Sequence, residues 1–325
     1  MQRSQVLSSE SGEARVSYDV LWSRIGRSSG RRSILAMFCN LFKARVAARR
    51  LAYWVPVLSI GLSGGAWSQT PSPLQEWQYS GGVALEKLFE PNVPDWRTVL
   101  GGAADYKPLY DGASLTRTQG GPVINIRYKD LAFASVGEGL GLNVVHGDHY
   151  RGGLALCYDL GRLVSNDVGH LEGLGDIKRA PAIKAFFSYA VSKSFPLVVR
   201  ADVRQILGGA DGMEADLDAF LPLPGSSRKL IMFAGPSFTY ADHRYMQKEF
   251  GVTTTQSLAS GYPVYDAHAG ADAVGMGFSG TVFLTSHWLI NVDTAVNRLL
   301  GSASESPITQ VRVQHTLALS LAYSW

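Results

Sequence analysis

The chain has 325 residues, 35 of them glycine, and a formal net charge of +3. No uninterrupted run of eighteen apolar residues is present, which excludes a membrane-spanning helix and leaves two soluble domains or one large closed sheet. Residues 1–68 hold 10 of the 30 basic and 3 of the 27 acidic side chains, so the remainder has 20 basic and 24 acidic residues. The excess of positive charge therefore belongs to the first segment, and nucleic acid is not an expected partner.

The segment 51–65 (LAYWVPVLSIGLSGG) has the features of a secretory signal peptide. It follows a basic run that ends at Arg50, and it leads into Ala66-Trp67-Ser68, where small residues stand at the positions that precede a cleavage site. A signal anchor is the alternative, but Pro56 and the glycines make a poor helix. We therefore expect cleavage after Ser68.

These features divide the chain into four parts. We expect residues 1–36 to be a disordered or non-native extension, because they precede the usual start of such a signal. The signal peptide itself occupies 37–68, and 69–76 (QTPSPLQE) is a polar linker. Residues 77–325 then form the folded part.

Segments in which apolar and polar residues alternate follow one another from Trp77 to the end. This period of two predicts β-strands with one apolar face. Residues 131–145 are interpreted as one long strand that bends at its glycines. The twelve predicted strands cover residues 77–86, 97–106, 119–128, 131–145, 150–161, 183–192, 197–204, 213–221, 230–240, 274–284, 288–296 and 311–325.

The connections between the later strands alternate in length. In chain order they are 162–179 (long), 193–194 (short), 222–227 (short), 242–268 (long), 285–287 (short) and 298–310 (long). Short turns on one side and long loops on the other are typical of outer-membrane β-barrels. Two connections fit this rule less well, since 208–212 is short for an outer loop and 107–118 is long for an inner turn. The pattern predicts an all-β, antiparallel transmembrane barrel of about twelve strands.

Two consecutive predicted strands carry opposite charges on their polar face. With the turn at 208–212, the two sets would face each other across a hairpin. A solvated sheet face could hold the same charges, so this feature supports a barrel without requiring one. In a barrel, these side chains form a lumenal charge network: Arg200, Asp202, Arg204, Glu214, Asp216 and Asp218.

The last strand, 311–325 (VRVQHTLALSLAYSW), has the clearest alternation in the chain. It is long enough to cross a bilayer, and it ends on aromatic residues as the terminal strands of bacterial outer-membrane barrels do. The final strand of a soluble sandwich is the alternative. We interpret Tyr323 and Trp325 as lipid-side interfacial residues that act as the assembly signal.

Residues 77–325 also resemble one family. The segments that carry the resemblance are GPVINIRYKDLAFASVGEGLG (121–141), LEGLGDIKRA (171–180), ADVRQ (201–205), GPSFTYADHRYMQKEFGVTTTQSLASGYPVYDAHAG (235–270) and RLLGSASESPI (298–308). Together with the carboxy-terminus, they are similar to the MipA/OmpV outer-membrane proteins, and the segment from Gly235 is the most specific. Residues 1–36 have no counterpart in that family.

The resemblance implies an outer-membrane barrel of a Gram-negative bacterium, with lipid around it. A founding member of the family links a lytic murein transglycosylase to a bifunctional penicillin-binding protein, and other members are linked to adhesion or stress responses. The resemblance therefore implies a non-enzymatic scaffold. It implies no catalytic residue, no cofactor and no metal ligand. The alternatives are a small-solute channel, an adhesion or stress-response protein and, more remotely, an outer-membrane hydrolase.

Several groups of residues could suggest chemistry but fit simpler roles. His146, Asp148 and His149 lie on a predicted tight turn without a further ligand, so a polar turn is the preferred interpretation. Asp242, His243 and Tyr245 open the longest loop, where a hydrogen-bond network is the better explanation. The charged lumen is interpreted as a neutralising network that plugs a narrow barrel, with a selectivity lining as the alternative.

Overall fold

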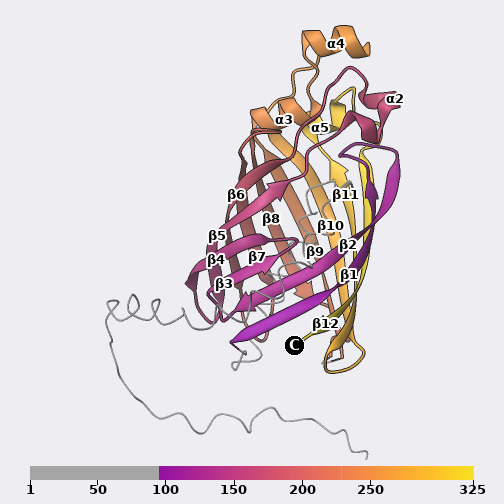
Figure 1. The fold of residues 1–325 in the computed structure, drawn as a ribbon. Coiled ribbons are helices and arrows are strands. Elements are labelled where there is room, and N and C mark those ends of the chain that lie inside the picture. Colours follow the sequence, from indigo (N-terminus) through magenta and orange to yellow (C-terminus); the bar gives the residue numbers. More distant parts are fainter. Residues whose placement is uncertain (1–94, 228) are drawn as a thin grey trace, which may run out of the picture. The chain divides into compact units, whose positions relative to one another are not determined.

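The computed structural model describes residues 95–227 and 229–325. The expected extension, signal peptide, cleavage site, linker and first strand at 77–86 all lie outside the described residues. Within the described part, the chain forms a closed barrel in which each strand pairs with its neighbours in sequence and β1 pairs with β12 (Figure 1). No helix among the described residues is long and apolar enough to span a membrane.

All twelve strands of the barrel are antiparallel to their neighbours. They are β1 (Trp96–Pro108), β2 (Thr116–Tyr128), β3 (Ala132–Ser135), β4 (Gly139–His146), β5 (Tyr150–Asp159), β6 (Ala180–Ala190), β7 (Val198–Ile206), β8 (Met213–Pro222), β9 (Leu230–Ala241), β10 (Gly270–Phe283), β11 (Trp288–Leu299) and β12 (Val313–Ser324).

The alternation of residue types explains why these segments close into a barrel with an apolar exterior. In β6 the side chains are buried and exposed in strict turn, with Lys184 and Phe186 inside and Ile183 and Phe187 outside. The exposed residues of the wall are large and apolar, which suits contact with lipid. Closing the ring pairs the backbone groups of every strand edge that would otherwise lack a partner in hydrocarbon.

The interpretation of 131–145 as one bent strand is wrong, because this segment forms the hairpin of β3 and β4. The turn is stabilised by Gly139, whose φ of +87° favours glycine. An added Cβ at Gly139 would also lie 2.1 Å from the carbonyl oxygen of Leu156. The hairpin is short, and β3 pairs with only Asn125–Tyr128 of the 13-residue strand β2. The number of strands still reaches twelve because the hairpin adds one strand within the described residues.

This hairpin also changes the side on which two connections lie. The segment 107–118 was expected as an inner turn, but the 109–115 connection lies with the long loops. The backbone N–H of Gln310 donates to the carbonyl of Gly112 at 2.8 Å, which joins this connection to the one before β12. The turn at Lys129 and Asp130 is accordingly at the short-turn end. The sequence-based assignment failed because it used one strand where the structure has two.

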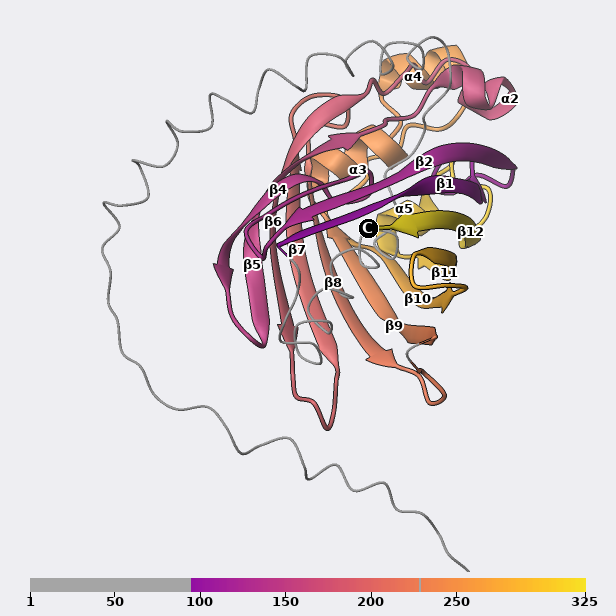
Figure 2. The ribbon, with the colours of Figure 1, turned by 60° about the horizontal axis from the view of Figure 1, so that its bottom comes forward.

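Short helices gather at the end with the long loops, which we call the outer end, whereas the carboxy-terminus lies at the opposite, inner end (Figures 1 and 2). The helical segments are η4 (Val164–Asn166), α2 (Val168–Leu171), α3 (His243–Phe250), α4 (Thr254–Ser260) and α5 (Gly301–Glu305). Asp242 begins α3 as its N-cap, since its carboxylate accepts from the N–H of Tyr245 at 2.8 Å.

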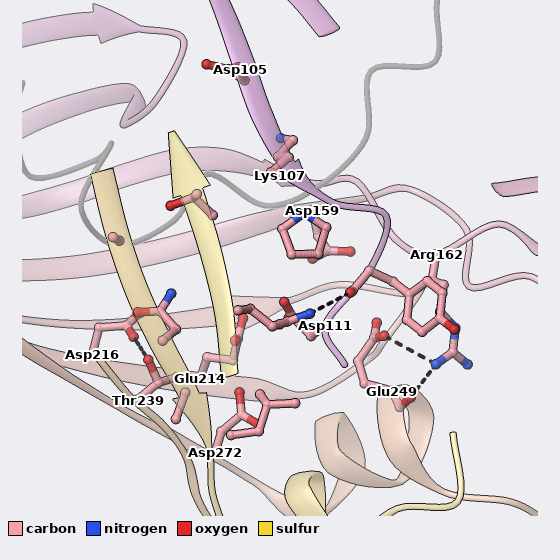
Figure 3. A pocket seen from close by; sticks show the side chains of 18 of the residues that line it. Asp105, Lys107, Asp111, Asp159, Arg162, Glu214, Asp216, Thr239, Glu249 and Asp272 are labelled. Carbon is pink, nitrogen blue, oxygen red and sulfur yellow. Dashed lines mark hydrogen bonds and ion pairs between the residues drawn. The ribbon is translucent and has the colours of Figure 1, made fainter. Parts of the chain in front are cut away.

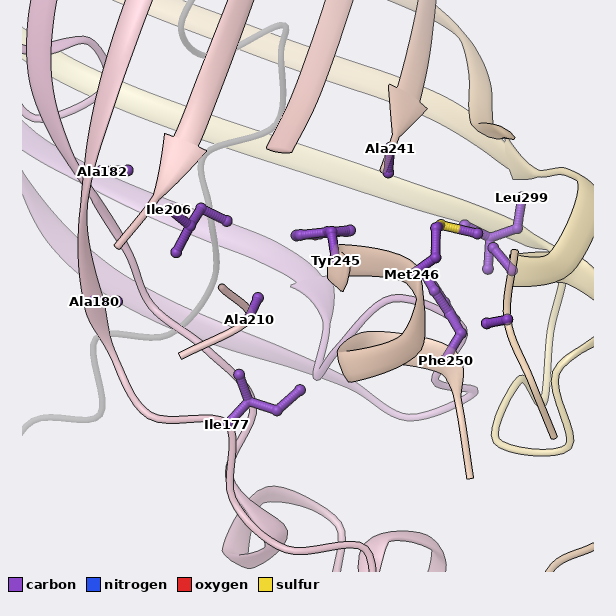
Figure 4. Packing of buried hydrophobic residues seen from close by; sticks show 12 residues of the cluster. Ile177, Ala180, Ala182, Ile206, Ala210, Ala241, Tyr245, Met246, Phe250 and Leu299 are labelled. Atoms are coloured by element: carbon purple, nitrogen blue, oxygen red, sulfur yellow. The ribbon is translucent and has the colours of Figure 1, made fainter. Parts of the chain in front are cut away.

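Helix α3 packs across the outer mouth of the barrel. Its residues Tyr245, Met246 and Phe250 are buried in one cluster with side chains from β6, β7, β9 and β11 (Figure 4). Strands β6 and β11 lie five strands apart around the ring, so this cluster connects nearly opposite walls. Burial of each such side chain contributes about 1.5–3 kcal/mol. A second cluster joins the outer connections to each other and contains Tyr110, Ala113, Leu171, Leu174, Val252 and Ile308.

Aromatic rings lie near the inner end of the wall. Trp96 and Tyr128 have ring centroids 4.6 Å apart, and Tyr323 lies 5.2 Å from Trp288 and 4.6 Å from Trp325. Aromatic girdles of this kind stand at the membrane interface of barrels. The structure thus places Tyr323 and Trp325 in an aromatic group at the inner end; their role as an assembly signal is a proposal.

Candidate functional site

The structure places the six charged residues expected to face the lumen on the inner faces of β7 and β8. In the hairpin, Arg200 stands opposite Asp218, Asp202 opposite Asp216 and Arg204 opposite Glu214. All six are buried, with exposed fractions of 7% or less. A buried charge is tolerated only when it is paired or loses its charge, so the partners of these side chains decide what each part of the lumen can do.

Around Arg200 the charges pair closely. Its Nε lies 3.1 Å from the carboxylate of Asp202, and its terminal nitrogen lies 3.0 Å from Oε2 of Glu138. Lys184 of β6 reaches the same Oε2 at 3.3 Å. The guanidinium of Arg200 also lies over the ring of Phe186, 5.3 Å from its centroid. We call Glu138, Lys184, Arg200 and Asp202 the ion-pair layer.

The sequence did not identify Glu138 as a member of this layer. Its position fell inside the segment interpreted as one bent strand, whereas it lies in the β3–β4 turn and points its carboxylate into the lumen. The available signal was the sequence Gly137-Glu138-Gly139, in which glycines flank a charged residue. Such a pattern favours a turn over a strand interior.

An acidic chamber of about 130 Å³ lies beside helix α3 (Figure 3). It is on the outer side of the ion-pair layer, because Arg204, which lines it, lies nearer than Arg200 to the outer end of β7. The walls of the chamber come from the outer parts of β1, β5, β7, β8, β9, β10, β11 and β12, and α3 covers it with Tyr245 and Glu249. Three basic side chains contribute to the lining: Lys107, Arg162 and Arg204. Eight carboxylates contribute to it: Asp105, Asp111, Asp159, Glu214, Asp216, Glu249, Asp272 and Asp293.

Part of this acidic lining is neutralised by specific contacts. Arg204 donates to Oε2 of Glu214 at 2.6 Å, and Thr239 donates to Asp216 at 2.6 Å. Asp216 nevertheless stands directly opposite Asp202, which places two buried carboxylates in one cross-strand pair. Like charges that face each other destabilise a sheet. This part of the lumen therefore has more negative charge than its own cations balance.

Helix α3 contributes a second contact between opposite charges. Arg162 is 3% exposed, and its guanidinium lies 3.9 Å from Oε2 of Glu249 and donates to the backbone carbonyl of the same residue. Burial raises the pKa of Glu249 to about 8, and the carboxylates of Asp159 and Asp111 act in the same direction, while Arg162 opposes them. A carboxyl with such a pKa exchanges its proton near neutral pH.

Asp272 and Asp293 are chamber carboxylates that each have an oxygen without a hydrogen-bond partner among the described residues. In Asp272, which is 5% exposed, this oxygen is Oδ1. Figure 3 shows Asp272 beside the chamber, below Glu214. A buried carboxylate oxygen without a donor costs free energy in the folded state. The position therefore favours a proton or a cation in the chamber.

A smaller cleft of about 20 Å³ lies on the inner side of the ion-pair layer. Arg127, Lys129 and Arg151 line it, with Glu138 as its carboxylate. Asp130 approaches this cleft, with a carboxylate oxygen 3.7 Å from Arg151. The two ends of the lumen thus differ in sign, since the outer chamber is acidic and the inner cleft is basic.

The other polar groups singled out in the sequence lie near the two rims. His146 approaches Asp130 at 3.5 Å near the turn at 147–149. His243 lies at the outer rim, where its Nδ1 is 2.9 Å from the carbonyl of Ala267. His243, Asp266 and His268 are the residues within the described ranges whose ligand atoms approach closely enough to hold a metal ion. The sequence analysis missed Asp266 and His268 because they stand more than twenty residues beyond His243.

Comparisons with known proteins place this barrel in a family. A family model described as "MltA-interacting protein MipA" matches residues 100–325. A search of curated proteins finds no match.

Among solved structures, the chain resembles the translocator domain of autotransporter NalP from Neisseria meningitidis, with 11% identity, a TM-score of 0.39 and coverage of 77% of this chain and 94% of that one. It also resembles an outer membrane channel from Pseudomonas putida F1, with 9% identity and a TM-score of 0.38. This match covers 72% of this chain and 97% of the channel. The CymD monoaromatic hydrocarbon channel is 8% identical, with a TM-score of 0.38. That match covers 80% of this chain and 94% of the channel. The family match spans most of the chain and nearly the whole barrel, and the protein therefore belongs to the MipA family.

Proposed function

We propose that this protein is a non-enzymatic scaffold of the outer membrane that holds murein-remodelling enzymes at its periplasmic side. The partners proposed are a lytic murein transglycosylase and a bifunctional penicillin-binding protein. The description of the matching family model, an MltA-interacting protein, supports the first partner. The apolar exterior of the barrel supports the outer membrane as its location.

The main support for this proposal is that side chains of the barrel close the lumen on both sides of the acidic chamber. Lys184 and Arg200 are 0% and 1% exposed within the ion-pair layer, and α3 packs across the outer mouth. Because side chains of the barrel close its interior, other proteins can bind only its outer surface and its rims. The short turns at the inner end, which is periplasmic in such barrels, are the surfaces that a periplasmic enzyme reaches.

Export to that membrane requires a signal. We propose cleavage after Ser68, so that the mature chain begins at Gln69. Amino-terminal sequencing of protein from the outer-membrane fraction checks this. A sequence that begins before Leu51 would contradict it.

Charge changes at the two ends of the barrel test the scaffold. Asp148 and Lys193 are exposed on inner turns, whereas Glu172 and Lys178 are exposed on an outer connection. The double variant Asp148→Lys/Lys193→Glu should weaken binding of purified transglycosylase to the vesicle-embedded protein by about tenfold, or about 1.4 kcal/mol. The matched variant Glu172→Lys/Lys178→Glu should bind like the original chain. Equal binding by all three proteins, or no binding by any, would contradict the scaffold.

The acidic chamber supports a second candidate function, the binding of small organic cations. Its eight carboxylates exceed its three basic groups, and within residues 95–227 and 229–325 Oδ1 of Asp272 has no hydrogen-bond partner. Spermidine is a suitable probe because its amines supply both positive charge and hydrogen-bond donors. Calorimetry should show saturable binding that Asp272→Asn and Glu249→Gln both weaken. Binding unchanged in both variants would assign spermidine to another surface.

A further inference from the structure

The connection between β9 and β10, residues 242–269, brings two histidines and an aspartate together at the outer rim. His243 is the first residue of α3 and follows β9 by one residue, whereas Asp266 and His268 lie just before β10. The ligand atoms of the three side chains all lie within 4.8 Å of one another. The rings of His243 and His268 are stacked at 6.5 Å, and Nδ1 of His268 lies 3.9 Å from a carboxylate oxygen of Asp266.

The backbone around these residues is held in place by hydrogen bonds. Asp242 caps α3, which fixes the start of the helix at His243. Gln247 of the same helix accepts from the N–H of Ala267 at 2.8 Å, and Ser302 accepts from the N–H of His268 at 3.1 Å. The two ends of the connection are therefore fixed relative to each other before any ligand binds.

The hydrogen bonding of His243 leaves one ring nitrogen suited to a metal. Its Nδ1 lies 2.9 Å from the carbonyl oxygen of Ala267, and an imidazole nitrogen so placed donates its proton to that oxygen. In a neutral ring, Nε2 is then the unprotonated nitrogen with a lone pair. Metal-binding histidines commonly use a backbone carbonyl in this way to set the tautomer and the ring orientation.

We propose that His243, Asp266 and His268 bind one divalent transition-metal ion, with Zn²⁺ the best-suited, which fastens the two ends of the 242–269 connection to each other. Two imidazoles and one carboxylate favour Zn²⁺, Ni²⁺ or Cu²⁺ over Mg²⁺ or Ca²⁺, which prefer oxygen ligands. Three protein ligands leave the fourth position of a tetrahedral ion to water. All three side chains are exposed, so the ion has access from solvent.

Only small movements are needed to complete the site. Ligand atoms around a tetrahedral zinc ion stand about 3.3 Å apart, as bond lengths near 2.0 Å require. Side-chain rotations of the exposed Asp266 and His268 can supply the remaining approach, which is at most about 1.5 Å from the present separations. Since His243 begins α3, the bound ion would also hold the helix that covers the acidic chamber.

Metal titration of the purified full-length chain, refolded in lipid vesicles and treated with a chelator, tests this site. Calorimetry with ZnCl₂ should show one ion per chain. The variant His268→Ala should weaken binding by more than about 100-fold, because it removes a direct ligand, whereas loss of an outer contact costs about 10–100-fold. The control His287→Ala removes an exposed histidine at the inner end and should bind like the original chain.

Cobalt gives a second readout that does not depend on affinity. Co²⁺ bound by two imidazoles and a carboxylate should show the visible absorption of a four-coordinate ion, and His243→Ala should abolish this absorption. Heat-modifiable migration on a gel checks that each variant is folded. Zinc affinity that is unchanged in folded His268→Ala, or the absence of saturable zinc binding in the original chain, would overturn the proposal.

Discussion

The ion-pair layer and the acidic chamber both lie on the inner face of the barrel, but they differ in charge balance. The buried charges of the ion-pair layer are paired, whereas those of the chamber are mostly negative. In the ion-pair layer, Glu138 accepts from both Lys184 and Arg200, so cations and carboxylates approach balance. In the chamber, eight carboxylates surround three basic groups, and Oδ1 of Asp272 has no hydrogen-bond partner in the described part of the chain. The ion pairs of the layer stabilise the fold. In the chamber, repulsion between carboxylates destabilises the fold, and a bound proton or cation relieves this repulsion.

Charged side chains from turns and helices contribute to this difference in charge balance. The ion-pair layer receives Glu138 from the β3–β4 turn, which enters the lumen and supplies the counter-charge for two cations. The chamber receives Glu249 from α3, which adds a carboxylate to walls that are already acidic. Strand alternation alone would give both regions polar inner faces. The turn makes the ion-pair layer neutral, whereas the helix adds one more negative charge to a chamber whose walls are already acidic.

Removal of Glu138 should have the largest effect on stability. Glu138→Ala leaves Lys184 and Arg200 buried without this carboxylate, and loss of one partner of a buried pair costs about 3–5 kcal/mol. Urea unfolding of the protein in lipid vesicles measures the change. The exposed Glu172 provides the control, since Glu172→Ala should change stability by less than about 0.5 kcal/mol. Equal stability of the two variants would show that the ion-pair layer is not needed for the fold.

The second prediction compares the two faces of the β7–β8 hairpin. Val203 and Leu217 are exposed on the wall, with exposed fractions of 41% and 50%. Val203→Arg or Leu217→Arg should destabilise the barrel by about 2–4 kcal/mol, the cost of a charge on the lipid side near the midplane. Asp216→Asn should be tolerated because it relieves the repulsion from Asp202 opposite. Folding titrations into vesicles measure all three, and an Asp216→Asn variant as damaged as Leu217→Arg would reverse the face assignment.

The third prediction concerns pH and the chamber. The carboxyl of Glu249 has an ordinary pKa of 4.5, and burial raises its pKa in the folded chain to about 8. Between these values the folded chain keeps a proton that the unfolded chain has released. The contribution of Glu249 to the free energy of unfolding is therefore most favourable below pH 4.5 and is lost as the pH rises to 8. Glu249→Gln should flatten the fall of stability over this window by up to about 1.4 kcal/mol per pH unit, measured by urea unfolding at several pH values. An unchanged slope would contradict the assignment of this proton to Glu249.

The smallest effect is expected at Asp272. Its replacement by asparagine removes a carboxylate from an acidic surrounding and leaves no cation unpaired, so Asp272→Asn should change stability by less than about 0.5 kcal/mol. The informative quantity is the difference in unfolding free energy between this variant and Glu138→Ala, because both residues are buried carboxylates. A loss at Asp272 as large as the loss at Glu138 would mean that the chamber is a paired network too.

The alternation of the sequence, together with the alternating lengths of the connections, predicted the barrel, and the resemblance to the family is confirmed. The same alternation put Arg200 and Asp216 inside and Val203 and Leu217 outside, as the structure has them. It could not place side chains from turns and loops, since these have no period that ties them to one face. The β3–β4 hairpin was missed because its glycines were interpreted as a bend.

Residues that complete the two regions come from outside the strands. Glu138 lies in a turn, and Glu249 lies in a helix within a connection of more than twenty residues. Their positions depend on tertiary packing of α3 and of the outer connections, which a period in the sequence does not report. The same holds for Asp266 and His268, whose approach to His243 depends on how the 242–269 connection folds back.

The central claim is that the lumen is closed by its own side chains, so that the protein acts through its surfaces. Single-channel recording of the purified chain in a planar bilayer tests this most directly. We predict no stable unitary conductance from the original chain. A chain in which 243–260 is replaced by a short glycine-serine turn and Glu138, Lys184 and Arg200 by alanine should show conductance if it folds. Stable, ohmic conductance from the original chain would contradict the claim and favour a small-solute channel.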